Sequence, residues 1–226
     1  MEADQRNARI FGVLFIVTFI TSIPALALYQ PVLDDPAAYI AGGGNDSQIY
    51  LGALLELLLI IANIATAVVV FPILRRQNEV LSLGYVTARL MECTFIAAGI
   101  LLVLGIVSLR QDSPDASALA VSLAALKDWT FLLGPGFIVG WGNGLILGYL
   151  MYRSRLVPRW MAWLGLVGGP LIILSGIGVL FGAWDAGGLV QGIATAPEFV
   201  WELSLGIYAA VWGFRRDSPI LLQASG

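Results

Sequence analysis

The chain has 226 residues, of which 58% are hydrophobic and 12% are charged, and its net charge is −3. Soluble domains carry about 25% charged residues, so this composition, with a mean hydropathy of +0.85, excludes an ordinary soluble protein. The sequence has no histidine and one cysteine, Cys93, which excludes an internal disulfide, a Ser-His-Asp triad, histidine-ligated haem and the usual zinc sites.

The hydrophobic residues are gathered in six long blocks. Crossing ~30 Å of hydrocarbon takes about 20 apolar residues, and a backbone in lipid must satisfy its own hydrogen bonds, so each block predicts a helix. The sequence therefore predicts an all-α, polytopic transmembrane helical bundle that forms one domain, residues 1–226. Its six spans are residues 10–28, 50–72, 84–108, 129–151, 160–182 and 198–214.

The first block contains Pro24–Ala27, PALA, which is similar to a signal-peptide cleavage site. Glu2 and Asp4 precede the block, however, and its apolar run is long for a signal peptide. We expect it to remain in the protein as the first span.

The basic residues predict the orientation of the bundle. Nine arginines fall at the N-terminus, in the second and fourth loops, or at the C-terminus, whereas the other loops contain Arg110 and Lys127 among seven aspartates. The positive-inside rule therefore places both termini in the cytoplasm, and we expect the bundle to lie in the cell (inner or plasma) membrane. No further basic patch indicates nucleic-acid binding. The nine arginines are Arg6, Arg9, Arg75, Arg76, Arg153, Arg155, Arg159, Arg215 and Arg216.

Polar residues interrupt the second and third spans, although an Arg or Asp at a helix centre costs about 2.5–3.5 kcal/mol. Glu56 and Asn63 are seven residues apart and share one stripe of the second span. At a rise of ~1.5 Å per residue, Arg89 lies ~6–8 Å from the cytoplasmic end, and Asn63 and Glu92 lie ~12–13 Å from it. Two interpretations remain open: Glu92 neutralises an Arg89 that snorkels outward, or Glu92 turns toward Asn63 and forms the floor of a polar pocket.

The outer loops carry two helix-start signals. Asp35-Pro36 and Ser113-Pro114 each pair an N-cap residue with proline at the first helical position. Residues 114–127 form either a short amphipathic helix on the outer surface or an extension of the fourth span.

The fourth span has a glycine at every fourth position, and such a stripe lets another helix approach closely. We expect this approach to occur within the bundle; a homodimer face is the alternative. The stripe consists of Gly136, Gly140, Gly144 and Gly148.

The same depth estimate predicts two polar layers. Asn143 lies ~12–13 Å from the cytoplasmic end, whereas Glu56 and Glu202 lie at about 20–23 Å, where we expect no basic residue. A low dielectric disfavours an ionised carboxylate. Each of these two glutamates is therefore protonated, lines a hydrated cavity or meets a cation; the alternative is that both are neutral hydrogen-bonding groups that tie helices together.

The remaining polar residues of the spans have smaller predicted roles. Thr195–Pro197 predicts the start of the sixth helix, with Glu198 in its first turn as a residue that complements the helix dipole. Further lining of a polar pocket could come from Thr18, Thr21, Ser22 and Ser175.

Four segments carry a resemblance to a known family. RIFGVLF, LLELLLIIAN, GYVTARLMEC and SRLVPRWMAWLGLVGG begin at residues 9, 54, 84 and 154, and together they resemble the bacterial membrane-protein family called domain of unknown function 4386. The resemblance implies a bacterial multi-helix membrane protein and supplies no catalytic residues. It also implies that Glu56, Asn63, Arg89 and Glu92 belong to the family pattern.

Three functional hypotheses follow. The first is binding or transport of a small molecule or cation through a carboxylate-lined pocket; the second is a scaffold or interaction subunit in which the polar residues specify helix packing. The third, an intramembrane enzyme, has the least support, and we expect no catalytic residue, cofactor or metal. The expected partners are the lipid bilayer, a ligand and, as an alternative, a second copy. The hypothesised ligand or proton site consists of Glu56, Asn63, Arg89, Glu92, Asn143 and Glu202.

Overall fold

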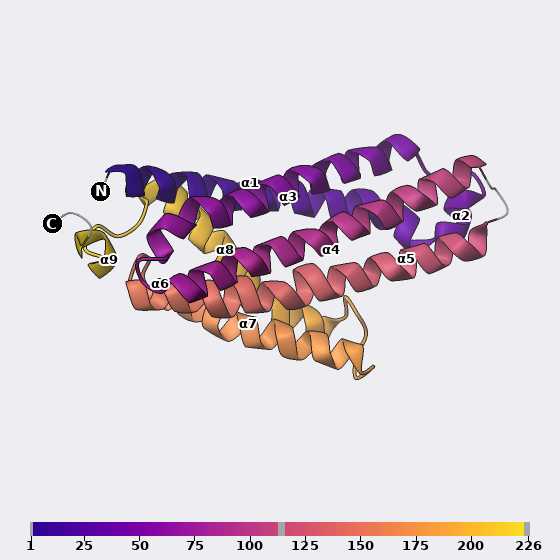
Figure 1. Ribbon diagram of the computed structural model, residues 1–226. Coiled ribbons are helices and arrows are strands. Elements are labelled where there is room, and N and C mark those ends of the chain that lie inside the picture. Colours follow the sequence, from indigo (N-terminus) through magenta and orange to yellow (C-terminus); the bar gives the residue numbers. More distant parts are fainter. Residues whose placement is uncertain (1, 113–115, 224–226) are drawn as a thin grey trace.

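The computed structural model describes residues 2–112 and 116–223, and within these ranges every regular element is a helix. The long helices lie side by side along one axis, and α7 and α8 cover one side of the bundle (Figure 1). The elements are α1 (Glu2–Asp34), α2 (Pro36–Ile40), α3 (Asp46–Leu74), α4 (Glu79–Asp112), α5 (Ser117–Phe131), the π-helices η1 (Leu132–Ile138) and η2 (Gly140–Leu147), α6 (Gly148–Ser154), α7 (Arg159–Leu180), α8 (Leu189–Trp212) and α9 (Pro219–Leu222).

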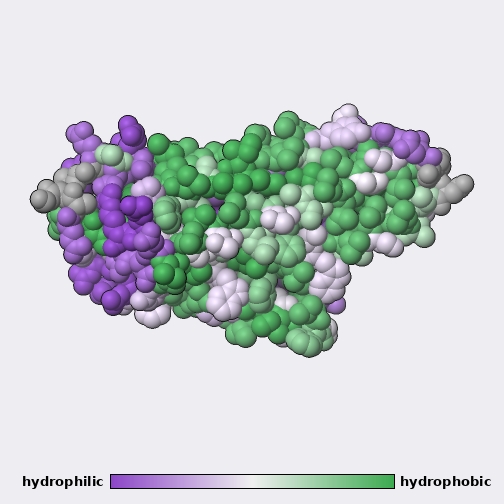
Figure 2. All heavy atoms as spheres, viewed as in Figure 1, coloured by the Kyte–Doolittle hydropathy of each residue, from purple (hydrophilic) through white to green (hydrophobic). Residues whose placement is uncertain are grey.

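Five helices in the described part of the chain are long and apolar enough to cross a membrane: α1, α3, α4, Ser117–Ser154 and α7. They contain the first four predicted spans and all but the last two residues of the fifth, 160–182. Outward-facing residues such as Ile20, Ile61 and Leu101 are 62%, 64% and 72% exposed, and Figure 2 shows a broad hydrophobic surface along the bundle. Soluble monomers rarely expose apolar patches of this extent. The chain is therefore a multi-pass helical protein with a membrane-type surface.

The start of the sixth helix was predicted wrongly. Helix α8 begins at Leu189, and Pro197 lies inside it. The helix packs against α1 and α7, and these neighbours stabilise it around the proline, which lacks one backbone donor. Because Gln191, Glu198 and Glu202 lower its hydropathy, α8 is not among the five most apolar helices. A sixth crossing by α8 stays a prediction.

Both ends of the described chain lie at the same end of the bundle (Figure 1), where hydrophilic residues gather (Figure 2). The start of α1 is tied to the end of α3 by an ion pair between Asp4 and Arg76 of 2.8 Å. The segment after α8 is tied to the α6–α7 loop, because Arg215 N donates to Leu156 O at 2.9 Å. The cytoplasmic location of this end stays a prediction.

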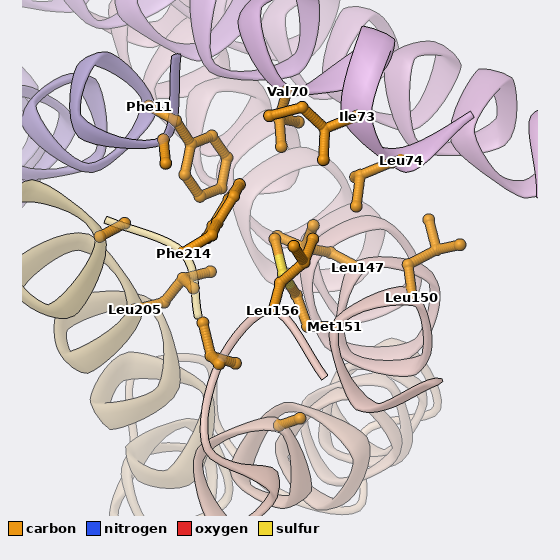
Figure 3. Packing of buried hydrophobic residues seen from close by; sticks show 14 of the residues in the cluster. Phe11, Val70, Ile73, Leu74, Leu147, Leu150, Met151, Leu156, Leu205 and Phe214 are labelled. Carbon is orange, nitrogen blue, oxygen red and sulfur yellow. The ribbon is translucent and has the colours of Figure 1, made fainter. Parts of the chain in front are cut away.

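The largest hydrophobic cluster lies beside this hydrophilic end and joins the two halves of the chain. Phe11 of α1, Leu74 of α3, Leu147 of η2 and Leu205 of α8 are fully buried, and Phe214 closes the cluster from beyond α8 (Figure 3). Burying such side chains contributes about 1.5–3 kcal/mol each in water. The cluster therefore holds these helices together between the hydrophilic end of the bundle and the region where the polar side chains meet.

At the opposite end, the predicted N-cap at Asp35 is confirmed. The Asp35 carboxylate accepts a hydrogen bond from Ala38 N at 2.9 Å, and Pro36 starts α2. Tyr39 of α2 then donates to Asp46 at 2.6 Å; burial, together with this bond, raises the pKa of Tyr39 to about 12. The other predicted cap, Ser113-Pro114, lies outside the described residues.

Residues 117–131 continue directly into the fourth span, and the helix runs from Ser117 to Ser154. Of the two alternatives, the structure therefore has the extension for residues 117–127; residues 114 and 115 lie outside the described part. The middle of this helix is π-helical, with Pro135 inside η1. Proline cannot donate its backbone hydrogen bond, and π-helical turns are frequent at functional sites.

The glycine stripe of the fourth span packs within the chain. A methyl group added to Gly144 would lie 2.4 Å from Gly169 Cα, and one added to Gly140 would lie 2.8 Å from Gly169 O. Gly148 likewise lies against α7, whereas Gly136 meets atoms of its own helix. Because α7 occupies most of the stripe, the stripe is not an open face for a second copy.

Candidate functional site

A cavity of about 300 Å³ lies inside the bundle and is lined by residues of α1, α3, α4, α5, η1, α7 and α8. The structure brings five of the six predicted site residues to its wall, although they come from three separate helices. The sixth, Asn143, lies behind the wall and hydrogen-bonds to one of the five. The five lining residues are Glu56, Asn63, Arg89, Glu92 and Glu202.

One part of the wall is a network between α3 and α4. Arg89 Nη1 donates to Glu92 Oε2 at 2.7 Å, and Asn63 Nδ2 donates to Glu92 Oε1 at 3.1 Å. Arg89 is 2% exposed, and its guanidinium lies 5.2 Å from the centroid of the Phe15 ring. Glu92 therefore contacts both candidate partners, and Arg89 points into the bundle instead of snorkelling to the surface.

A second ion pair was missed by the sequence analysis. Lys127 Nζ lies 2.8 Å from Glu56 Oε1 and 3.1 Å from Oε2, so the expectation that no basic residue lies near Glu56 was wrong. Lys127 was assigned to a loop, but it belongs to α5, whose helical path turns its side chain inward. Gly99 makes room for it, because a methyl group there would lie 2.7 Å from Nζ.

Glu202 meets Asn143, whose side-chain amide donates to Glu202 Oε1. The backbone carbonyl of Asn143 also accepts a hydrogen bond from Trp201 Nε1 at 3.0 Å. The prediction that Glu202 shares a level with Glu56 was wrong. Counted from the hydrophilic end, Asn143 is 154 − 143 = 11 residues inside its helix and Glu202 is 212 − 202 = 10. The fourth span was predicted to end at residue 151, three residues before Ser154, and the sixth at residue 214, two residues after Trp212.

Glu198 is the functional candidate that the sequence analysis misassigned. It lies in the middle of α8, lines the cavity and is 2% exposed. Within the described residues, neither of its carboxylate oxygens has a hydrogen-bond partner. Methyl groups added to Gly144 and Gly168 would lie 2.9 and 2.8 Å from Glu198 Oε2, so these two glycines make room for the carboxylate. Its i, i+4 spacing from Glu202 could have indicated from the sequence that the two glutamates share one face of the helix.

The charges around the cavity do not cancel. Glu92 pairs with Arg89 and Glu56 pairs with Lys127. Glu198, Glu202 and the exposed Asp128, which also lines the cavity, have no ion-pair partner among the described residues. An unpaired ion in a low dielectric costs several kcal/mol. Asp128 is open to solvent, so Glu198 and Glu202 are the two acidic groups inside the bundle that a proton, water or cation can stabilise.

Most of the remaining wall is apolar, and it reaches the outer surface. Ile23, Phe131 and Phe199 line the cavity and are also 54%, 47% and 44% exposed. A residue that faces both spaces lies at an opening. The cavity therefore reaches the membrane-facing surface between α1, the α5–η1 segment and α8.

The hydroxyl groups proposed as extra lining contribute unevenly. Thr18 and Ser22 line the cavity, but the Thr18 hydroxyl donates to Phe15 O of its own helix. Thr21 and Ser175 are not among the residues of the wall. In the described part of the chain, no group of three or more His, Cys, Asp and Glu side chains is arranged to hold a metal ion.

Comparison with known proteins gives one match. The model of a family described as "Domain of unknown function (DUF4386)" matches residues 10–213. No curated protein and no solved structure matches the chain. The matched range includes α3 to α8 in full and therefore all of the polar residues of the cavity wall.

Proposed function

We propose that this chain, which belongs to the family described as "Domain of unknown function (DUF4386)", binds a small molecule inside its helical bundle and carries it across the bacterial inner membrane. One observation carries this proposal: a cavity of about 300 Å³ contains, besides the exposed Asp128, two acidic side chains of α8 that no basic residue of the described chain neutralises. Its volume is at the lower end of the range for ligand pockets, about 300–1,000 Å³.

The energetics favour a binding role over a purely structural one. Glu198 is buried without a hydrogen-bond donor among the described residues, and such a group lowers stability by about 1–3 kcal/mol or more. Proteins retain costs of this kind mostly at functional sites. A side chain used only to tie helices together would be hydrogen-bonded to a neighbouring helix, as Asn63 is to Glu92.

The position of the cavity supports passage across the membrane. Its polar groups lie in the interior of α3, α4 and α8, between the hydrophilic end of the bundle and the outer loops. Transporters commonly bind their substrates near the bilayer midplane between interrupted helices. Here the interrupted helix is the fourth span, whose π-helical segment contains Asn143.

Filling the cavity tests the proposal. Val139 lines the cavity and is 8% exposed, so Val139→Phe places a ring in it, whereas Leu101→Phe adds similar bulk at a side chain that is 72% exposed. We expect ligands from a panel of small cations, neutral molecules and anions to raise the melting temperature of wild-type protein in lipid nanodiscs. The Leu101→Phe control should respond equally and Val139→Phe should not. Equal responses of all three proteins would contradict the proposal.

A scaffold role is the second candidate, and a specific observation favours it. The polar contacts join different helices: Asn63 with Glu92, Glu56 with Lys127, and Asn143 with Glu202. Such contacts specify helix packing. Under this hypothesis no member of the panel would shift the melting temperature, and Glu198→Gln would leave assembly with partner proteins unchanged.

A further inference from the structure

The two unneutralised glutamates of α8 lie one helical turn apart and both line the cavity. Glu202 accepts one hydrogen bond, from Asn143, whereas both oxygens of Glu198 lack a donor in the described chain. Carboxylates are acceptors, so the group that satisfies them must bring donors, and charge-assisted hydrogen bonds are the strongest that they form. An ammonium group brings three donors and the missing positive charge.

The rest of the wall distinguishes an organic cation from a bare metal ion. Phe19, Phe131 and Phe199 line the same cavity as the two glutamates. Aromatic faces stabilise desolvated organic cations and also bind their apolar parts. A hard inorganic cation would need about six oxygen ligands, and the described residues contain no group of three or more acidic side chains placed to bind one.

The basic residues of the wall do not reverse this charge balance. Lys127 forms an ion pair with Glu56, and Arg89 forms one with Glu92. Arg89 Nε and Nη2 nevertheless have no hydrogen-bond partner among the described residues. An anion held by these two donors is therefore the competing ligand class.

We infer that the ligand is a small organic cation, a protonated amine with an apolar body, and that Glu198 and Glu202 bind its ammonium group while the phenylalanines enclose its body. This inference rests on the proposed function, because it names the substrate class of the same cavity. Glu198 is the principal anchor, since it is the more buried of the two and has no other partner in the described structure.

A charge series of nearly equal size tests the inference. Benzylammonium, benzyl alcohol and benzoate share one ring and differ in charge. Their binding to the protein in nanodiscs is measured by equilibrium dialysis at pH 7, with empty nanodiscs subtracted. We expect wild type to bind benzylammonium at least about tenfold more tightly than the other two, because charge-assisted hydrogen bonds are the strongest that a buried carboxylate forms.

Two variants locate the charge recognition. Glu198→Gln and Glu202→Gln each keep the side-chain shape and should weaken benzylammonium binding at least tenfold while leaving benzyl alcohol within about twofold. Glu79→Gln makes the same chemical change at an exposed position in the first turn of α4 and should have no effect. Either cavity variant serves if the other fails to fold.

The outcomes distinguish a wrong ligand class from a wrong proposed function. Tighter binding of benzoate, no binding of benzylammonium, or full retention of benzylammonium binding by both cavity variants overturns the inference. If a probe other than the cation binds and Val139→Phe abolishes that binding, the proposed function stands and the substrate class is wrong. If Val139→Phe changes the binding of none of the three probes, the proposed function fails as well.

Discussion

Lys127 shows how a single buried residue changes the chemistry of the cavity. Its side chain is 5% exposed, and its ammonium group contacts both carboxylate oxygens of Glu56. It also lies 5.1 Å from the centroid of the Tyr29 ring. Without it Glu56 would join Glu198 and Glu202 as a third unneutralised glutamate of the cavity wall.

Breaking this pair should destabilise the fold. Lys127→Met leaves Glu56 buried and unpaired, and we expect the free energy of unfolding to fall by about 3–5 kcal/mol. The double variant Lys127→Met, Glu56→Leu removes both charges and should recover most of the loss, because replacing a whole buried pair is often neutral. Denaturant titration in detergent, read by circular dichroism, measures both. A double variant no more stable than the single one would contradict this account.

Among the elements, the fourth span and α7 approach each other through glycine. Gly144 and Gly169 face one another, and the same gap admits the Glu198 carboxylate from α8. The sequence pattern indicates a close approach but leaves its partner open. The structure adds that the glycines also make room for a polar side chain, which gives Gly144 and Gly168 a role in shaping the site.

Two glycines, Gly144 in the fourth span and Gly192 in α8, provide a matched test. A methyl group at Gly144 meets backbone atoms of α7, so Gly144→Ala forces the helices apart, and we expect it to lower stability by about 1–3 kcal/mol. Gly192 lies in α8 with nothing within 4 Å of an added methyl group. Gly192→Ala should therefore raise stability by about 0.5–1 kcal/mol. Thermal unfolding in detergent compares them, and equal effects would contradict the close packing.

At the scale of the whole molecule, the open question of topology is whether α8 crosses the membrane. Both ends of the described chain lie at one end of the bundle (Figure 1), as an even number of spans requires. Helix α8 has the length for a crossing, 24 residues at ~1.5 Å each. Its acidic residues face the cavity and not the lipid, which lowers the cost of placing them in the membrane.

Cysteine labelling tests this topology. Single cysteines replace the exposed residues Glu79, Asp185 and Arg216 in a Cys93→Ala background, and an impermeant maleimide is applied to sealed vesicles of either orientation. We expect Glu79→Cys and Arg216→Cys to react from the cytoplasmic side and Asp185→Cys from the other side. Wild-type Cys93, which is 5% exposed, should stay unlabelled. Reaction of Arg216→Cys from the same side as Asp185→Cys would rule out a sixth crossing.

The sequence by itself determined the helical membrane class, the first five spans and most of the polar wall. It could do so because crossing hydrocarbon requires long apolar helices, and because polar residues stand out within them. Helix ends were harder to predict from the sequence. Pro197 was interpreted as a helix start, but it lies inside α8, which is stabilised by packing against α1 and α7.

Only the tertiary structure decided which polar residues are paired. Lys127 and Glu56 are 71 residues apart, and Asn143 and Glu202 are 59 apart, so no local pattern records that they meet. Glu198 became a candidate through the same long-range packing, because Gly144 and Gly168 leave a space for it that only the folded bundle contains. Local hydropathy determines where a helix lies; the charge balance of an internal cavity depends on which side chains distant helices bring together.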